Sequence, residues 1–234
     1  MYHTTDNVMK LGKRLKEAST KIDRSKSYPL AEAVALAQET SKVKFDASLE
    51  LHMNLNIDAK KGDQLVRATV ALPYGTGKVL RIAAFVPEDQ IKEAQAAGAD
   101  IVGSQELIEE IKKTNKCDFD IAVATPDMMK NLAPIARILG QKGLMPNPKT
   151  GTIALEVTKL IQALKKGKIS YKNDGGGTIH VAFGKVSFPL DQLIANAEAL
   201  VDSIRKAKPQ SVKGTFVRSV FISSSMGPSI RAAI

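Results

Sequence analysis

Short hydroxyl side chains gather near the end of the sequence, together with a glycine and an arginine. Residues 218–228 read Arg-Ser-Val-Phe-Ile-Ser-Ser-Ser-Met-Gly-Pro. Hydroxyls, backbone amides and cations can hydrogen-bond phosphates and 2′-hydroxyls, the groups that folded RNA presents. Residues 225–227 directly follow an expected strand, and Pro228 restricts the chain after them. From Ser229 onward we expect a solvated tail without a role.

Nucleotide chemistry is suggested by Gly77-Lys78, but its surroundings argue against it. A phosphate-binding loop needs a glycine where Leu72 stands and a magnesium-binding hydroxyl where Val79 stands, and it opens a helix. Here a strand is expected next. A nucleotide-binding enzyme that uses the middle of the chain stays open as an alternative.

Metal and nucleophile chemistry find no support in the spacing of histidine and cysteine. His3, His52 and His180 are far apart in sequence, and Cys117 has no cysteine partner. Because His52 falls on the polar side of an expected strand, we predict that it is solvated. We therefore expect no cofactor, no metal and no catalytic activity.

A stiff loop is predicted at residues 143–152, Gly-Leu-Met-Pro-Asn-Pro-Lys-Thr-Gly-Thr. Two prolines fix their own φ and push the preceding residues toward extended geometry. Gly143 and Gly151 bracket the run and permit positive φ values. We expect Leu144, Met145 and Lys149 to be exposed.

The charge is unevenly distributed along the 234 residues. The net charge is +10, and residues 1–75 carry +3, residues 76–159 carry zero and residues 160–234 carry +7. A basic protein favours a polyanionic partner. Because the two ends share the excess, we predict one discontinuous basic domain, 1–75 and 160–234, with 76–159 inserted into it.

The hydrophobic pattern distinguishes the two predicted domains. Residues 49–57 alternate strictly between apolar and polar, which indicates a strand with one buried face. Residues 168–173 and 178–183 predict a hairpin around the glycines at 175–177. The outer parts are thus predicted to be a two-layer α+β domain with a mostly antiparallel sheet.

The middle of the chain reads as strand and helix in alternation. Strands are expected at 79–86, 100–102 and 119–124, and helices at 87–97, 105–113 and 127–139. This order predicts a parallel sheet with helical crossovers, a Rossmann-like three-layer α/β domain. No apolar run is long enough to span a membrane, and neither signal nor transit peptide is recognised, so we expect a cytoplasmic protein.

Four motifs together resemble one family of bacterial ribosomal proteins, the one numbered first in the large subunit. They are Gly-Leu-Met-Pro-Asn-Pro-Lys at 143–149, Leu-Pro-x-Gly-Thr-Gly at 72–77, Ile-Asp-Ala-Lys-Lys-x-Asp-Gln-x-Val-Arg at 57–67, and Lys-Gly-Thr-Phe with Ser-Met-Gly-Pro-Ser near the end. The resemblance covers nearly the whole chain. It implies a non-enzymatic protein of the mobile stalk beside the tRNA exit site.

The resemblance further implies partners and site residues. The outer domain would bind large-subunit rRNA and a similar fold in its own operon's mRNA, the stalk would assist release of deacylated exit-site tRNA, and the free protein would be monomeric. A repressor that acts only on mRNA is a further alternative. The implied and neighbouring RNA-binding residues are Lys44, Phe45, Ser48, Glu50, Lys168, Lys172, Arg218, Ser219, Ser225, Met226 and Gly227. The implied hinge residues are Pro73, Gly75, Gly77 and Gly167.

Overall fold

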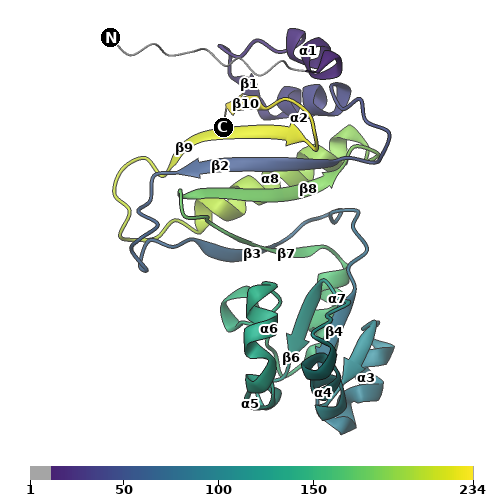
Figure 1. Cartoon of the computed structure of the whole chain (residues 1–234). Helices are drawn as coiled ribbons and strands as arrows, with labels where there is room; N and C mark the ends of the chain where they lie inside the picture. The colour runs from purple at the N-terminus through teal and green to yellow at the C-terminus, as the bar shows by residue number, and fades with distance from the viewer. Residues whose placement is uncertain (1–11, 234) are drawn as a thin grey trace, which may run out of the picture.

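The computed structural model describes residues 12–233, apart from the side chain of Lys149. Within it the chain forms three β-sheets accompanied by helices (Figure 1). The predicted mixed α/β class is confirmed. No helix of the described range is long and apolar enough to cross a membrane.

The largest sheet joins the beginning and the end of the chain. Its strand order is β1-β10-β9-β2-β8. The strands are β1 (Tyr28–Pro29), β2 (Ser48–Leu55), β8 (Thr178–Lys185), β9 (Val217–Ser224) and β10 (Ile230–Ala233). β2 pairs antiparallel with both β8 and β9. β10 contradicts the expected idle tail, because Ile230 is buried and the strand continues the ladder of β9.

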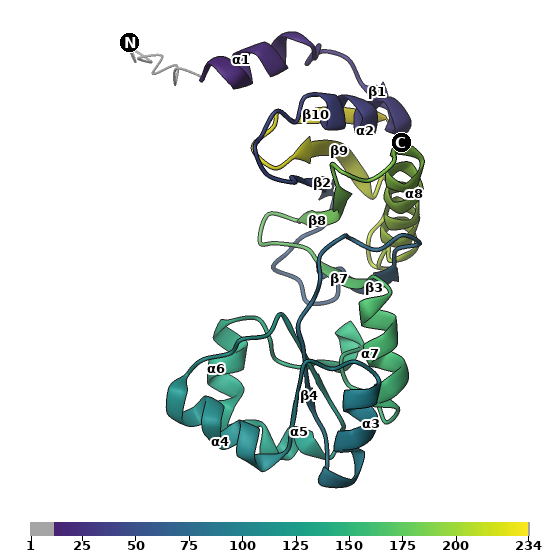
Figure 2. The same ribbon diagram turned by 90° about the vertical axis from the view of Figure 1, so that its right-hand side faces the viewer.

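The predicted period of two in β2 is confirmed by burial. Leu49, Leu51 and Met53 are fully buried, whereas the residues between them are partly exposed. Helices α2 (Leu30–Glu39) and α8 (Leu190–Lys206) cover the buried face, and the opposite face is left open (Figure 2). The short helix α1 (Lys13–Thr20) lies beyond the β10 side of the sheet.

The predicted hairpin at residues 168–183 is wrong. The turn forms, with the Gly177 amide donating to the Asp174 carbonyl, but only the Asn173–Ile179 bridge joins its two sides. β7 (Lys168–Lys172) pairs instead with β3 (Arg67–Ala71), and β8 pairs with β2. A local turn pattern cannot reveal that each strand has a better partner elsewhere.

The third sheet is parallel, with strand order β5-β4-β6. It contains β4 (Ile82–Phe85), β5 (Ile101–Gly103) and β6 (Ile121–Ala124), accompanied by α3 (Ile91–Ala96), α4 (Gln105–Thr114), α5 (Met128–Asn131), α6 (Ala136–Gln141) and α7 (Val157–Lys165). Both faces of β4 are buried, as parallel sheets require.

Two expectations for this region are wrong. The helix expected at 127–139 is divided into α5, a 3₁₀ turn and α6, because Pro134 supplies no amide for a continuous helical ladder. Val79 does not belong to the buried run, since its side chain is 89% exposed.

Two segments connect the parallel sheet to the rest of the chain, and one glycine from each, Gly75 and Gly167, lie against each other. Gly75, Gly77 and Gly167 have φ values of 67°, 72° and 102°, which disfavour other residues. A Cβ on Gly167 would lie 2.4 Å from Gly75 Cα. The buried Asn196 of α8 also accepts from the Tyr74 amide at 3.1 Å and donates to the Gly75 carbonyl at 2.8 Å.

The loop at 143–152 has the predicted glycine geometry but not the predicted exposure. Gly143 and Gly151 have φ values of 69° and 59°. Leu144 and Met145, however, are partly buried against the core formed by α4, α5 and α6. The predicted division of the chain near residues 75 and 160 stays a prediction.

Candidate nucleic-acid interface

The open face of the five-stranded sheet, formed by β8, β2 and β9, carries two adjacent rows of partly exposed side chains. β2 contributes Ser48, Glu50, His52 and Asn54, and β9 contributes Ser219, Phe221 and Ser223, followed by Ser225. Glu50 lies opposite Ser223, and Asn54 lies opposite Ser219. Ser219 and Ser225 are six residues apart, so the row is roughly 20 Å long.

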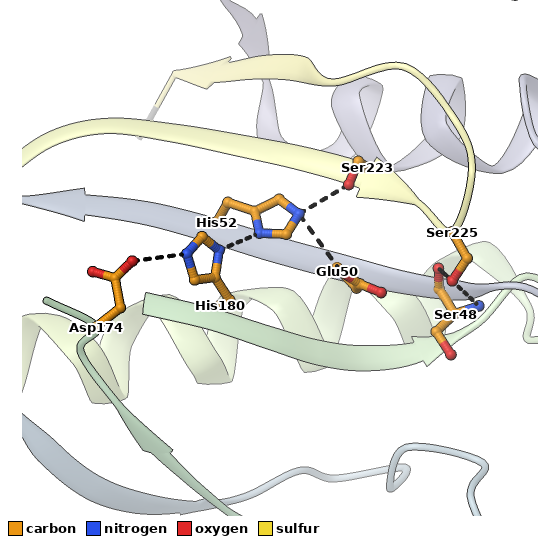
Figure 3. Close-up of polar contacts among 7 residues, drawn as sticks. All are labelled: Ser48, Glu50, His52, Asp174, His180, Ser223 and Ser225. Atoms are coloured by element: carbon orange, nitrogen blue, oxygen red, sulfur yellow. Dashed lines mark hydrogen bonds and ion pairs between the residues drawn. The ribbon is translucent and has the colours of Figure 1, made fainter. Parts of the chain in front are cut away.

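Ser225 is fixed against the start of β2. The Ser225 amide donates to the Ser48 carbonyl at 2.9 Å, and the Ser48 amide donates to Ser225 Oγ at 3.3 Å (Figure 3). Lys185 Nζ lies 2.9 Å from Ser48 Oγ. A cation that the sequence analysis did not single out therefore stands beside the predicted hydroxyls.

Met226 and Gly227 form a tight turn after β9. Met226 has a φ of 64°, and its side chain is 70% exposed. The Gly227 amide donates to the Ser224 carbonyl at 2.8 Å. A Cβ on Gly227 would lie 2.2 Å from Ser224 Oγ. Internal packing therefore accounts for a glycine at this position, whether or not RNA approaches it closely.

Arg14 of α1 joins the two loops at this end of the sheet. Its guanidinium donates to the Lys42 carbonyl at 3.2 Å and to the Met226 carbonyl at 3.0 Å. Phe45, which is 56% exposed, lies between Lys42 and β2 in the chain. Two exposed apolar side chains, Phe45 and Met226, are thus presented by loops tied to one guanidinium. No pattern along the chain indicates this role for Arg14.

A line of polar contacts crosses the open face of the sheet (Figure 3). His52 Nδ1 lies 2.8 Å from His180 Nδ1, and His52 Nε2 lies 2.9 Å from Ser223 Oγ. Asp174 Oδ2 lies 3.4 Å from His180 Nε2, and Glu50 Oε2 lies 3.8 Å from His52 Nε2. The prediction of a solvated His52 is wrong, because cross-strand register brings the two distant histidines together.

The environment shifts the acidities within this line. Burial lowers the pKa of His52, with a smaller lowering from the His180 ring and an opposing effect from Glu50. The Thr178 amide, together with that of Gly176 and with His180, lowers the pKa of the Asp174 carboxyl. Among the described residues, no group of histidine, cysteine and acidic side chains could hold a metal ion.

Three predicted cations do not belong to the open face. Lys168 and Lys172 lie on β7 and line a cleft of about 390 Å³ between the β3–β7 sheet and the loop at 143–152. Because side chains alternate along a strand, Arg218 of β9 does not belong to the row of Ser219, Phe221 and Ser223. Its Nε donates to Asn56 Oδ1 at 3.1 Å. Lys44 is exposed in the loop before β2. The open face is therefore less cationic than predicted.

Comparison with known proteins identifies relatives along nearly the entire chain. The model of the ribosomal protein L1p/L10e family matches residues 37–228. The chain is 50% identical over 222 residues to large ribosomal subunit protein uL1 of Mycoplasma mycoides, covering 95% of this chain and 98% of that relative. The uL1 proteins of Macrococcus caseolyticus and Aromatoleum aromaticum are 49% and 47% identical over 222 residues, covering 95% of this chain and 96% and 95% of the relatives.

Proposed function

Because the chain belongs to the ribosomal protein L1p/L10e family, we propose that the open face of its five-stranded sheet binds folded rRNA of the large ribosomal subunit. The chain is a structural ribosomal protein and not an enzyme, and it resides in the cytoplasm as part of that subunit. The alternative of a nucleotide-binding enzyme is therefore set aside.

The observation that carries the proposal is the composition of the open face. Serine hydroxyls from β2 and β9 form adjacent rows, and exposed Met226 and Phe45 stand at one end. Hydroxyls suit 2′-hydroxyls and phosphates, and the apolar side chains would pack on sugars or bases and exclude water from those hydrogen bonds. Glu50 would accept from 2′-hydroxyls or base amino groups.

The cations would act mainly through long-range attraction. Lys44 and Lys185 lie near the serine rows. Lys168, Lys172 and Arg218 lie outside the open face, the two lysines in the cleft beside β7 and the arginine against Asn56. Binding that depends on such cations weakens as salt is added. We therefore expect a salt-dependent affinity with a salt-insensitive part from the serine rows.

We also propose the finer functions that the family resemblance implies. The division into a discontinuous RNA-binding domain, 1–75 and 160–234, and an inserted domain, 76–159, is supported by a core made of residues from the outer segments alone. Movement at residues 73–77 and 167 would let the inserted domain assist release of exit-site tRNA. The same RNA face would repress the operon's own mRNA, and the free protein would be monomeric.

The proposed RNA face is tested with two substitutions and a matched control. Met226→Asp and Ser225→Val should each weaken binding to an rRNA hairpin by about 1–3 kcal/mol, because a charge or an unpaired polar group is left at the interface. Leu155→Asp makes the same apolar-to-acidic change at a side chain that is 75% exposed but remote from the face. Filter binding over a salt series gives the affinities. Unchanged binding by both face variants would remove these residues from the interface.

A deletion tests the division of roles between the two domains. The backbones of Gly75 and Gly167 already touch, so residues 76–166 can be removed without stretching the remaining chain. We expect the shortened protein to retain most of its rRNA affinity. Complete loss of affinity in a folded deletion variant would contradict the division. Cosedimentation of the whole protein with large subunits separates a ribosomal role from a repressor that acts on mRNA alone.

A further inference from the structure

Four groups on three different chain segments form a continuous line across the proposed RNA face. The line runs from Asp174, in the turn before β8, through His180 and His52 to Ser223 (Figure 3). Ser223 belongs to the serine row of β9 and is partly exposed. The line therefore connects an acidic group at the β8 side of the sheet with a hydroxyl that RNA could contact.

The contact distances fix the direction of the hydrogen bonds when both rings are neutral. A neutral imidazole has one donor nitrogen and one acceptor nitrogen. The Asp174 carboxylate, 3.4 Å from His180 Nε2, can only accept, so it favours hydrogen on that nitrogen; His180 Nδ1 is then the acceptor and His52 Nδ1–H the donor. His52 Nε2 is then left to accept the Ser223 hydroxyl proton. In this state the Ser223 hydroxyl donates its hydrogen to His52 and can only accept hydrogen bonds from a ligand.

One added proton reverses this direction. A charged His180 carries hydrogen on both nitrogens, so its Nδ1–H donates to His52 Nδ1. His52 then carries its hydrogen on Nε2, from which it donates to Ser223 Oγ, with Glu50 Oε2 at 3.8 Å. The Ser223 hydroxyl proton is freed to point outward toward a phosphate oxygen.

We propose that His180 and His52 form a proton relay that sets whether Ser223 offers the RNA an acceptor or a donor. This inference rests on the proposed RNA-binding function of the open face. His52 and His180 act as positioning residues, because their effect on RNA passes through Ser223. The protonated state binds phosphate more tightly, since it supplies both an outward donor and one additional positive charge.

The two rings differ in exposure and in the groups beside them. The His180 side chain is the more exposed of the two and faces the Asp174 carboxylate, whereas burial and the His180 ring lower the pKa of His52. The titratable groups that face the pair in the described part of the chain are Glu50 from β2 and Asp174 from the turn before β8. β9 contributes the uncharged Ser223.

RNA binding across pH tests the relay. The affinity of the whole protein for an rRNA hairpin should rise about three- to tenfold between pH 8 and pH 5.5, the effect of one added charge near phosphate. The gain should be lost as pH rises and the added proton leaves the pair. His180→Ala should flatten this profile, Ser223→Ala should remove only the part of the rise that the freed hydroxyl supplies, and His3→Ala, outside the described residues, is the matched control.

The outcomes distinguish the relay from its premise. A pH-independent affinity in the wild-type protein, or a wild-type profile in folded His180→Ala, would overturn the relay and leave the RNA interface standing. Absence of hairpin binding at every pH would instead overturn the proposed function.

The relay has a readout that needs no RNA and no substitution. Long-range ¹H–¹⁵N correlation spectra of the histidine rings should show His52 protonated on Nδ1 and His180 on Nε2 at pH 8. On acidification His180 should gain its second hydrogen, and the hydrogen of His52 should move to Nε2. Two Nε2–H rings at pH 8, or His52 charging first, would refute the hydrogen-bond order.

Discussion

Gly227→Ala tests whether the turn after β9 is determined by internal packing. The new methyl would lie 2.2 Å from Ser224 Oγ and 3.1 Å from the Ser224 carbonyl oxygen, more than 1 Å inside normal contact with the hydroxyl. Rotation of the Ser224 hydroxyl would relieve only the first contact; relief of the second, to backbone, requires the turn to move, at the expense of the hydrogen bond from the Gly227 amide to that carbonyl. Overpacking costs about 1–3 kcal/mol and the hydrogen bond about 1 kcal/mol. We expect a loss of about 2–4 kcal/mol in the free energy of unfolding.

A second substitution makes this prediction sharper. Ser224 Oγ is buried and has no hydrogen-bond partner in the described part of the chain, so Ser224→Ala alone should change stability by less than about 1 kcal/mol. In the double variant the closest remaining atoms are the Ser224 carbonyl oxygen at 3.1 Å and Cβ at 3.4 Å. At least half of the lost stability should return, giving a coupling energy of about 1–2 kcal/mol.

Urea denaturation of the four proteins measures the cycle, and hairpin binding is followed alongside it. Gly140→Ala is the control, because Gly140 is helical and a Cβ there meets nothing within 4 Å. If Gly227→Ala keeps wild-type stability yet loses RNA binding, and adding Ser224→Ala does not restore that binding, then RNA approach rather than packing explains the glycine.

Three other substitutions probe separate parts of the structure. Asn196→Ala should cost about 3–5 kcal/mol in urea denaturation, because the backbone groups that it holds, including those of Tyr74 and Gly75, lose their partner in the core. Asp120→Asn should remove an acid-dependent part of stability: Lys78 holds the pKa of Asp120 below its usual value, so that contribution is present above pH of about 4 and is lost as pH falls through the lower folded value. Urea midpoints of variant and wild type should converge at the acidic end. Met226→Gly should stabilise the fold by up to about 1 kcal/mol, because glycine adopts the positive φ without strain, and it should weaken hairpin binding. Hairpin binding that strengthens together with stability would show that the Met226 side chain is not an RNA contact.

Patterns local to the chain were predictable from the sequence. The alternation at residues 49–57 predicted β2, and the repeated strand–helix order predicted the parallel sheet. Both predictions succeed because the faces of a strand that are buried determine which of its own residues are apolar. The glycine geometry at 143 and 151 followed from the neighbouring prolines in the same way.

Features set by pairing between distant segments were not predictable. The contact between His52 and His180 depends on the register of β2 against β8, which no spacing along the chain encodes. The same limit applies to Arg14, whose two partners come from separate loops. β10 was missed for a related reason: its four residues become a strand only because β9 offers an open edge.

The position of β2 between β8 and β9 has a consequence for synthesis of the protein. β2 is translated early, but both strands that complete its ladder are encoded more than 100 residues later. Closing such long loops is slow, so maturation of this sheet must wait for the late segments to emerge. An incomplete nascent polypeptide would therefore display the β2 half of the recognition surface without its β9 half. Premature capture of a transcript or an assembling subunit is thereby disfavoured until translation is almost finished.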